Sequence, residues 1–422
     1  MKVLMVGSGA YPDETGGAHV YVYELSRHLA RLGHTVTVLI RKSRPELPSR
    51  EMIDGLDYVR YPCTEASDPI RWRLRLYRGA RTAFAQLASQ QAFDVIHGHW
   101  PHPAAAVFRH AASQSALRVY TLHAPLFEEE QVEAAVLRRG SRLTPRNLLK
   151  AAWVPLSLCE KKATERGVLR RSAVVFTLSN FMHERARSCF GVPHSRLKII
   201  PGGADVARFC PVDDSRRLAI RSSLGLGAGT ILLLTVRRLV PRMGLANLVT
   251  AIRIVAEREP RVLLCIGGKG PLEGELQRMI GHLELRKHVW MAGFIPDAAL
   301  PDWFRAADFF VLPSEFLEGF GLATVEAMAC GTPALGTPVG GTPEILATLD
   351  KRLLFEGTSP QHLAQGILRN ICRQDLCELR GKVAASAHQR YSWQTVAREV
   401  EAVLLAELQA RRSFPGGAQP CG

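Results

Sequence analysis

The chain has 422 residues, of which 47% are apolar and 22% are charged, a composition that excludes collagen-like and disordered classes. The length favours two domains. Lys and Arg outnumber Asp and Glu by 54 to 39, a net charge of +15, and the excess is uneven. Residues 1–200 hold 29 basic and 17 acidic residues (+12), whereas residues 201–422 hold 25 and 22 (+3). The first half is therefore expected to attract anions.

The chain shows no targeting or disulfide pattern. The apolar run at the N-terminus ends at Gly7, so it is too short for the core of a signal peptide. No stretch approaches about 20 consecutive apolar residues, the length of a membrane-spanning helix. The 9 cysteines contain no Cys-x-x-Cys pair, which argues against a disulfide framework or a zinc finger. We expect a cytoplasmic protein, with peripheral attachment to the inner face of the membrane as an alternative.

The first half alternates short runs of β-branched residues with longer helical patterns. An amphipathic helix over residues 18–32 ends at Gly33 and separates the first two runs. This β-α-β alternation predicts parallel strands joined by crossover helices. Strands are predicted over residues 3–6, 35–40, 94–97, 119–122 and 173–178.

The second half repeats the pattern after residues 201–214, a segment rich in Gly, Pro and Asp that is typical of a linker. We predict an α/β fold of two facing, Rossmann-like, doubly wound domains over residues 1–205 and 206–390. Ligands bind beyond the carboxyl ends of the strands in such sheets, so an interdomain cleft is expected. Strands of the second domain are predicted over residues 230–236, 261–266, 288–292, 309–312 and 332–335.

A tight turn precedes a helix in the second half. Gly319, Phe320 and Gly321 form the turn, and the helix begins at about Leu322. Glycines at a helix start let a ligand approach the backbone, where the free N–H groups face an anion. The turn is therefore predicted to bind an anion such as a diphosphate.

Two glutamates lie on either side of this turn. Glu318 precedes the turn, and Glu326 lies one helical turn inside the helix. Carboxylates at these places are suited to accept hydrogen bonds from hydroxyl groups. The alternative is that both only favour the positive end of the helix dipole. We favour a nucleotide sugar, because it offers both phosphates and hydroxyls.

The same stretch resembles the signature of the family 4 glycosyltransferases, retaining enzymes of the GT-B fold. The family pattern is Glu-x7-Glu followed by A-M-A-x-G-x-P; here Glu318, seven residues and Glu326 precede A-M-A-C-G-T-P. Further similar segments are D-V-I-H-G-H-W, P-G-G-A-D-V-A-R-F-C-P and R-Y-S-W, so the likeness covers most of the chain. The resemblance implies that Glu318 contacts the donor sugar and Glu326 the ribose. It also implies a final helix, about 391–411, that packs back on the first domain.

The resemblance assigns roles to residues in both predicted domains. Gly16 and Gly17, at the start of the first helix, would lie against the donor diphosphate. His123 matches the family histidine beside the transferred sugar; a histidine that caps a strand end is the alternative reading. The backbone at Gly293 and Phe294 would hold the nucleobase.

One basic segment departs from the family pattern G-R-L-x-x-x-K-G. In T-V-R-R-L-V-P-R-M-G the family arginine maps onto Arg238, whereas Arg237 replaces the glycine and Met243 replaces the lysine. Because methionine carries no charge, Arg242 or Arg237 would have to take over the lysine's role towards the leaving diphosphate. A weakened enzyme is the alternative.

No metal or other cofactor is predicted. The motif D-x-D, which holds a cation in transferases of another architecture, does not occur in the chain. His97 and His99 share one strand face but have no acidic or cysteine partner nearby. We therefore interpret His97, His99 and Trp100 as part of an acceptor-facing loop.

Basic residues of the first domain cluster beside apolar ones, both at residues 71–81 and further along. Arg138, Arg142, Arg146 and Lys150 recur every four residues. Such clusters suit an anionic membrane surface, and solvated faces of ordinary helices are the alternative. A membrane partner would imply a lipid-linked or polyanionic acceptor.

These patterns predict a retaining, metal-independent hexosyltransferase that acts on a glycan or lipid-linked acceptor in surface polysaccharide or glycolipid synthesis. A non-catalytic relative that binds a nucleotide sugar or a glycan is the alternative, because of Met243. An NADP-dependent oxidoreductase is a remote alternative: Gly7 and Gly9 open like a dinucleotide fingerprint, but Pro12 takes the place of its third glycine. Nucleic-acid binding has no motif support.

Overall fold

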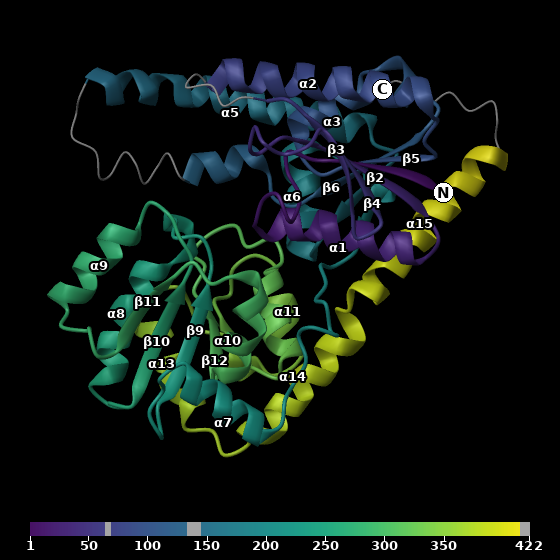
Figure 1. Cartoon of the computed structure of the whole chain (residues 1–422). Coiled ribbons are helices and arrows are strands. Elements are labelled where there is room, and N and C mark those ends of the chain that lie inside the picture. The colour runs from purple at the N-terminus through teal and green to yellow at the C-terminus, as the bar shows by residue number, and fades with distance from the viewer. Residues whose placement is uncertain (64–68, 133–144, 414–422) are drawn as a thin grey trace.

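The computed structural model describes residues 1–63, 69–132 and 145–413. It contains two sheets, one in each half of the chain. Each sheet and the helices packed on it form one lobe (Figure 1). The first sheet is 8-stranded in the order β3-β4-β2-β1-β5-β6-β7-β8, and the second is 5-stranded in the order β11-β10-β9-β12-β13. Neighbouring strands are parallel except in the hairpin β3–β4. The predicted α/β fold with two Rossmann-like sheets is thereby confirmed.

The strands of the first sheet are β1 (Lys2–Val6), β2 (Thr35–Arg41), β3 (Arg50–Ile53), β4 (Leu56–Tyr61), β5 (Val95–Gly98), β6 (Leu117–Leu122), β7 (Val174–Thr177) and β8 (Leu197–Ile199). Those of the second are β9 (Ile231–Val236), β10 (Val262–Gly267), β11 (Val289–Gly293), β12 (Phe309–Leu312) and β13 (Ala334–Gly336). The sequence patterns missed the two edge strands, β3 and β8, and also β4, which lies between β3 and β2.

The helices that cover the first sheet are α1 (Gly17–Arg31), α2 (Pro69–Gln90), α3 (Pro101–Phe108), α5 (Pro145–Arg171) and α6 (Asn180–Phe190). The second sheet carries α7 (Asp214–Ser223), α8 (Leu245–Ala256), α9 (Glu273–His282), α10 (Leu300–Ala306), α11 (Leu322–Ala329), α12 (Thr342–Leu346), α13 (Pro360–Ile371) and α14 (Leu376–Arg390). The last helix is α15 (Trp393–Ser413).

Side-chain alternation along the strands divides the first lobe into two cores. In β1, Val3 and Met5 join the core on the α1 side, whereas Leu4 and Val6 join the core on the opposite side. Helices α2, α3 and α5 lie on that opposite side, away from the second lobe, and α1 faces the second lobe (Figure 1). The core on the α1 side continues into the second sheet without interruption.

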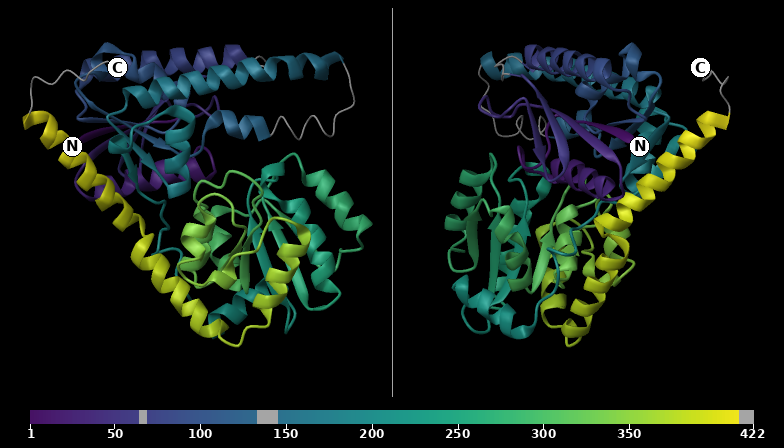
Figure 2. Two further views of the ribbon diagram at one scale, coloured as in Figure 1. Left: turned by 180° about the vertical axis from the view of Figure 1, so that it is seen from behind. Right: turned by 45° about the vertical axis from the view of Figure 1, so that its right-hand side comes forward.

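Helix α15 spans both lobes, as Figure 2 shows. It packs against α1, and Glu401 on α15 pairs with His34 at 2.7 Å. Trp393 at its start is fully buried and lies edge-on to Tyr21 of α1, with ring centroids 5.2 Å apart. The expected helix at about 391–411 therefore forms and packs back on the first lobe.

The linker between the sheets runs beside the start of α15. The backbone N–H of Ala204 donates to the carbonyl of Tyr391 at 2.7 Å, and Trp393 N–H donates back to Ala204 at 3.2 Å. Gly203 lies so close to the Trp393 ring that a Cβ atom there would come within 2.8 Å of it. The two segments in which the chain passes between the lobes, the linker at Ala204 and the start of α15, are thus hydrogen-bonded to each other. The domain boundary at residue 205 stays a prediction.

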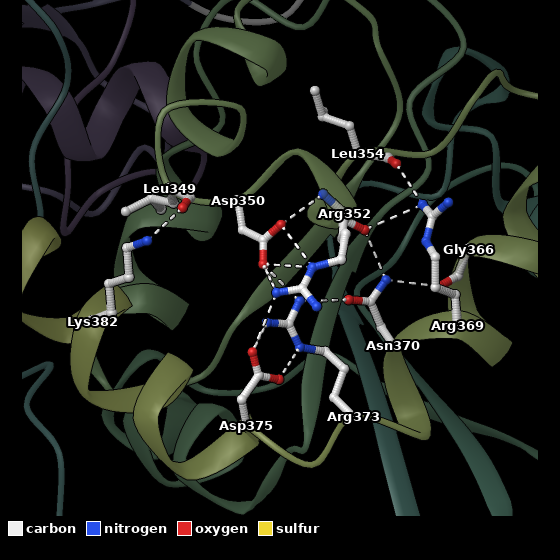
Figure 3. Close-up of polar contacts among 10 residues, drawn as sticks. All are labelled: Leu349, Asp350, Arg352, Leu354, Gly366, Arg369, Asn370, Arg373, Asp375 and Lys382. Carbon is white, nitrogen blue, oxygen red and sulfur yellow. Dashed lines mark hydrogen bonds and ion pairs between the residues drawn. The ribbon is translucent and has the colours of Figure 1, made fainter.

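A charged network links η5, α13 and α14 in the second lobe (Figure 3). Asp350, before the short helix η5 (Lys351–Leu353), accepts hydrogen bonds from Arg352 and Arg373, each at 2.8 Å. Arg373 also pairs with Asp375 at 2.7 Å, which ties the end of α13 to the start of α14. Burial raises the pKa of Asp350, but the hydrogen bonds from the two arginines outweigh it and hold that pKa below its ordinary value.

We expect the substitution Asp350→Asn to lower the free energy of unfolding by about 1–3 kcal/mol near neutral pH, because Arg373 loses its carboxylate. A carboxylate with a lowered pKa stabilises the fold above about pH 4 and loses this effect as the pH falls through its folded-state pKa. The difference between variant and parent chain should therefore shrink in acid. Denaturant unfolding at neutral and acidic pH checks this; equal stability at neutral pH would contradict it. Glu356→Gln, in an exposed pair with Arg369 at 3.7 Å, is the control.

Candidate active site

The helix α11 begins at Leu322, as the turn before it predicts. Gly321 takes the N-cap position with a positive φ of 88°, a conformation that favours glycine. The preceding segment, Pro313–Gly321, is called the acidic loop below. Leu317 in this loop also has a positive φ of 54°, which is uncommon for a branched side chain. The surrounding contacts therefore hold the loop in a strained shape.

Glu318 is buried and has two polar partners. Its carboxylate accepts a hydrogen bond from the Arg237 guanidinium at 2.7 Å and another from the Ser314 hydroxyl at 2.7 Å. Arg237 also donates to Ser314 at 3.0 Å, which closes the triangle. Burial lowers the pKa of Arg237, and the negative charge of Glu318 partly offsets this. The Nε atom of Arg237 is buried and has no partner among the described residues.

Glycines outside the acidic loop pack closely against its backbone carbonyls. Gly340, with φ 63°, leaves no room for a Cβ atom against the carbonyl of Glu318, and the N–H of Gly341 donates to that carbonyl at 2.8 Å. Gly244 similarly packs its backbone against Pro313. The Gly340–Gly341 turn therefore supports the backbone of Glu318.

The acidic loop meets the first lobe at glycine contacts. A Cβ atom on Gly319 would lie 2.5 Å from the carbonyl oxygen of His123, at the end of β6. A Cβ atom on Gly17, the first residue of α1, would lie 3.7 Å from the side chain of Leu322, the first residue of α11. The structure thus brings the starts of α1 and α11 together, next to His123. Phe320, between them, is buried against Gly202 of the linker.

His123 belongs to a cluster of aromatic rings. Its Nε2 atom lies 3.3 Å from Nδ1 of His99, and the Tyr21 ring packs edge-on to it at 5.0 Å. Burial lowers the pKa of His123 to about 3, so the imidazole is neutral near pH 7. His97 stacks on His99 with centroids 4.1 Å apart and contacts the Thr121 hydroxyl at 2.7 Å.

The histidines predicted to face an acceptor lie deeper than expected. His97 is 0% exposed and His99 only 3%, because packed side chains cover both faces of β5. They support His123 instead of lining a surface. Trp100, which caps the start of α3, is half-buried. No group of three or more potential metal ligands occurs within the described ranges.

The three arginines of the basic segment have different surroundings. Arg242 pairs with Glu129 of the first lobe at 2.9 Å and donates to the carbonyl of Leu317 at 3.2 Å. Arg237 is committed to Glu318, and Met243 packs in the core. Arg238 is exposed and has no hydrogen-bond or ion-pair partner in the described part of the chain.

This arrangement limits how the missing lysine can be replaced. To bind a phosphate as expected, Arg237 would have to weaken or break its ion pair with Glu318, and Arg242 its ion pair with Glu129. Arg238 is the cation that is available without such a loss.

Glu326 lies on the side of α11 that faces the linker and Asp297. Burial raises the pKa of Glu326 to about 8, and the positive charge of Arg208 offsets only part of this. Arg208 forms an ion pair with Asp297 at 2.7 Å, and Asp297 and Glu24 raise the pKa of Glu326 further. The carboxyl group is therefore mostly protonated near neutral pH in the absence of a ligand.

The loop after β11 contributes backbone and an exposed ring. Gly293 has φ 68°, and its carbonyl accepts a hydrogen bond from Gly268 N–H at 2.6 Å. Phe294, 51% exposed, follows it. Gly268 in turn packs against the backbone of Arg237, so the loops after β9, β10 and β11 interlock at one edge of the sheet.

Sequence patterns missed a set of contacts that link α6 to the acidic loop. Glu344 on α12 accepts hydrogen bonds from the backbone N–H groups of Asn180 and Phe181, at the start of α6. The Ser179 hydroxyl donates to the carbonyl of Gly319 at 2.7 Å. The N-cap serine was a visible signal for the helix start, but its partner 140 residues away was not.

Most of the predicted membrane-binding cluster lies outside the described residues or side chains. Arg138 and Arg142 lie outside the described residues, and for Arg146 and Lys150 only the backbone, in α5, is described. No helix within the described ranges is long and apolar enough to cross a membrane.

Known proteins resemble this chain over nearly its whole length. The family description "Glycosyltransferase Family 4" matches residues 15–208, and "Glycosyl transferases group 1" matches residues 217–390. Mannosylfructose-phosphate synthase of Agrobacterium fabrum is 27% identical over 95% of this chain and 88% of its own length.

Solved structures show the same fold. Sucrose-phosphate synthase from Thermosynechococcus elongatus superimposes with a TM-score of 0.79 at 20% identity, over 97% of this chain and 100% of the other. HepE of Anabaena, in complex with UDP and glucose, superimposes with a TM-score of 0.69 at 19% identity, over 96% and 100%. Family matches to both halves and the two-lobed fold agree with the Glu318–Glu326 signature: the chain belongs to the family 4 glycosyltransferases and is a glycosyltransferase of the GT-B fold.

Proposed function

We propose that this glycosyltransferase is a retaining, metal-independent hexosyltransferase with a nucleotide-diphosphate sugar as donor. The arrangement at the start of α11 carries the proposal: Glu318 before the helix, Glu326 inside it, and Arg238 just after the neighbouring strand β9, where its side chain has no partner among the described residues. Helix amides and arginine bind phosphate, and carboxylates accept hydrogen bonds from hydroxyl groups. The complex of HepE with UDP and glucose supports this class of donor.

Charge develops on both sides of the bond that breaks. The leaving diphosphate gains negative charge, which Arg238 and the amides at the start of α11 stabilise, and the sugar ring becomes positive. Glu318 holds a sugar hydroxyl and Glu326 the ribose. The neutral His123 exchanges hydrogen bonds with the sugar without adding charge. The acceptor hydroxyl attacks from the face that the diphosphate leaves, and its proton passes to the departing diphosphate oxygen. No covalent enzyme intermediate forms, so the configuration is retained.

Arginine and helix dipoles take the place of a cation in this proposal. The starts of α1 and α11 both present free N–H groups at the junction, and Arg238 adds a full charge. Gly16 and Gly17 let the diphosphate approach α1 closely. The absence of D-x-D from the chain agrees with this arrangement.

Two classes of acceptor have support. The positive charge of the first half favours a glycan or lipid-linked acceptor in surface polysaccharide or glycolipid synthesis. The names of mannosylfructose-phosphate synthase and sucrose-phosphate synthase instead favour a small phosphorylated sugar. Both classes are anionic or lie at an anionic surface, so the charge alone does not separate them.

A membrane-facing role of the first lobe has one further support. Helix α2 carries five arginines and no acidic residue, and it lies on the side away from the second lobe (Figure 1). Leu74 on α2 and Leu156 on the neighbouring α5 are exposed. Basic and apolar side chains together suit the surface of an anionic membrane.

The donor is testable by release of nucleoside diphosphate. We expect one of a panel of nucleotide hexoses to be turned over with EDTA present, with the anomeric configuration of the donor kept in the product by NMR. The acceptor arms are phosphorylated monosaccharides, a lipid extract and vesicles of anionic phospholipid. Binding of a nucleotide sugar without turnover in any arm would instead favour the non-catalytic relative to which Met243 points.

The site assignment is testable by substitution. Arg238→Ala and Glu326→Ala should each lower kcat/KM by more than about ten-fold, because each removes a contact to the donor. The midpoint of thermal unfolding should not fall, since neither side chain has a hydrogen-bond partner among the described residues. The control is Arg286→Ala, because this exposed arginine precedes β11, at the amino ends of the strands and not at their carboxyl ends. Near-normal rates in both variants would show that the site is assigned wrongly.

Glu326 should make nucleotide binding depend on pH. Because its pKa is raised to about 8 and the ionised carboxylate is the stronger acceptor for ribose hydroxyls, affinity should rise as the pH increases through about 8. Calorimetric titration with a nucleoside diphosphate at several pH values measures this. In Glu326→Gln the profile should become flat. A parent chain whose affinity does not change over this range would contradict the expectation.

A further inference from the structure

The start of α6 is held by a carboxylate from the other lobe. One oxygen of Glu344 accepts hydrogen bonds from the backbone N–H and the side-chain amide of Asn180, both at 2.7 Å, and the other accepts from the N–H of Phe181 at 2.9 Å. The first amides of a helix have no partner within the helix and carry partial positive charge, so a carboxylate is a strong partner for them. Three charge-assisted hydrogen bonds thus join α12 to α6.

A second hydrogen bond crosses the junction beside them. Ser179, the N-cap of α6, accepts from Met182 N–H at 3.2 Å and donates its own hydroxyl to the carbonyl of Gly319 at 2.7 Å. The start of α6 therefore contacts the second lobe through both α12 and the acidic loop.

The two contacts are mechanically linked on the second lobe. Glu344 lies three residues after Gly341, whose N–H donates to the carbonyl of Glu318 at 2.8 Å. A Cβ atom on Gly341 would come within 2.8 Å of the Gly319 carbonyl and 3.0 Å of Ser179 Cβ. The backbone at Glu318 and Gly319 is therefore packed between the turn that precedes α12 and the first lobe.

We propose that Glu344 is a positioning residue that docks α6 onto the second lobe and thereby sets the acidic loop against His123. The proposal rests on the proposed function in one respect, that Glu318 contacts the donor sugar. Glu344 itself touches no donor atom in this scheme. Its effect passes through the Gly340–Gly341 turn to Glu318, and through α6 and Ser179 to Gly319.

This role has a chemical consequence. The contact of Gly319 with His123 brings residues of both lobes to the transferred sugar, and closure of the lobes excludes water that would hydrolyse the donor. Without Glu344 the α6 amides lose their carboxylate and the lobes dock less tightly. Transfer should then slow, and a larger share of donor turnover should be hydrolysis.

Hydrogen exchange of the full chain, without substrate, tests the docking directly. In Glu344→Ala, we expect faster exchange in peptides that cover residues 179–183 and also in peptides that cover residues 316–322. The matched control is Glu356→Ala, which removes an exposed carboxylate in the same lobe. Faster exchange at 179–183 alone would overturn the proposal, because Glu344 would then cap α6 without positioning the acidic loop.

Kinetics supply the second measurement. Glu344→Ala should lower kcat for transfer by about ten- to hundred-fold, with a higher ratio of hydrolysis to transfer and a smaller change in donor KM. Ser179→Ala, which leaves Glu344 in place, should show the same pattern more weakly. Glu344→Gln, which keeps one acceptor oxygen, should lie between the parent chain and Glu344→Ala. Normal transfer in all three variants would overturn the proposal.

Failure of the proposed function gives a different result. If no donor is turned over by the parent chain, the proposed activity is wrong, whereas the exchange experiment still decides whether Glu344 docks the acidic loop. If Glu344→Ala does not fold, Glu344→Gln and Ser179→Ala carry the same comparison.

Discussion

The close backbone contact between Gly319 and His123 sets how the two lobes meet. The acidic loop passes between the first lobe and the turn before α12. A Cβ atom on Gly319 of the loop would clash with the His123 carbonyl, and one on Gly340 of the turn would clash with the Glu318 carbonyl, so both positions need glycine. This approach places Gly319 against the carbonyl of His123 and brings the start of α11 to the start of α1. The predicted contacts of the donor with both lobes depend on it.

Electrostatics at the junction follow from this packing. Glu318 is taken out of water, and a buried carboxylate needs a compensating partner. Arg237, at a position where the family carries glycine, supplies that partner together with Ser314. Arg242 is likewise engaged by Glu129, across the junction. Two arginines of the basic segment, Arg237 and Arg242, thus form ion pairs within the protein. The third, Arg238, is exposed and has no side-chain partner among the described residues, so it can bind a ligand.

The sequence predicted the parts of the site that are local. The helix at Leu322 and the turn at Gly321 follow from glycine and helix signals over a few residues, and the strand β12 before them was predicted with the observed bounds. The sequence patterns missed β3 and its neighbour β4 because the side chains of both strands are mixed in polarity, and they missed β8 because it is only three residues long. The acceptor-facing interpretation of His97 does not fit its 0% exposure: spacing shows which residues of a short strand share a face, but not that side chains cover both faces.

By itself the sequence determined the α/β class, the linker between the halves, the Glu318–Glu326 spacing and the charge difference between the halves. These depend on neighbours within a few turns, or on composition. Tertiary structure decided which arginine remains free, that Gly340 and Gly341 support Glu318, and that Glu344 binds the start of α6. Each of those facts joins residues that are far apart in the chain; Glu344 and Asn180 are separated by 164 positions. Spacing along the chain cannot show such pairs, because only the folded backbone brings their atoms within hydrogen-bond distance.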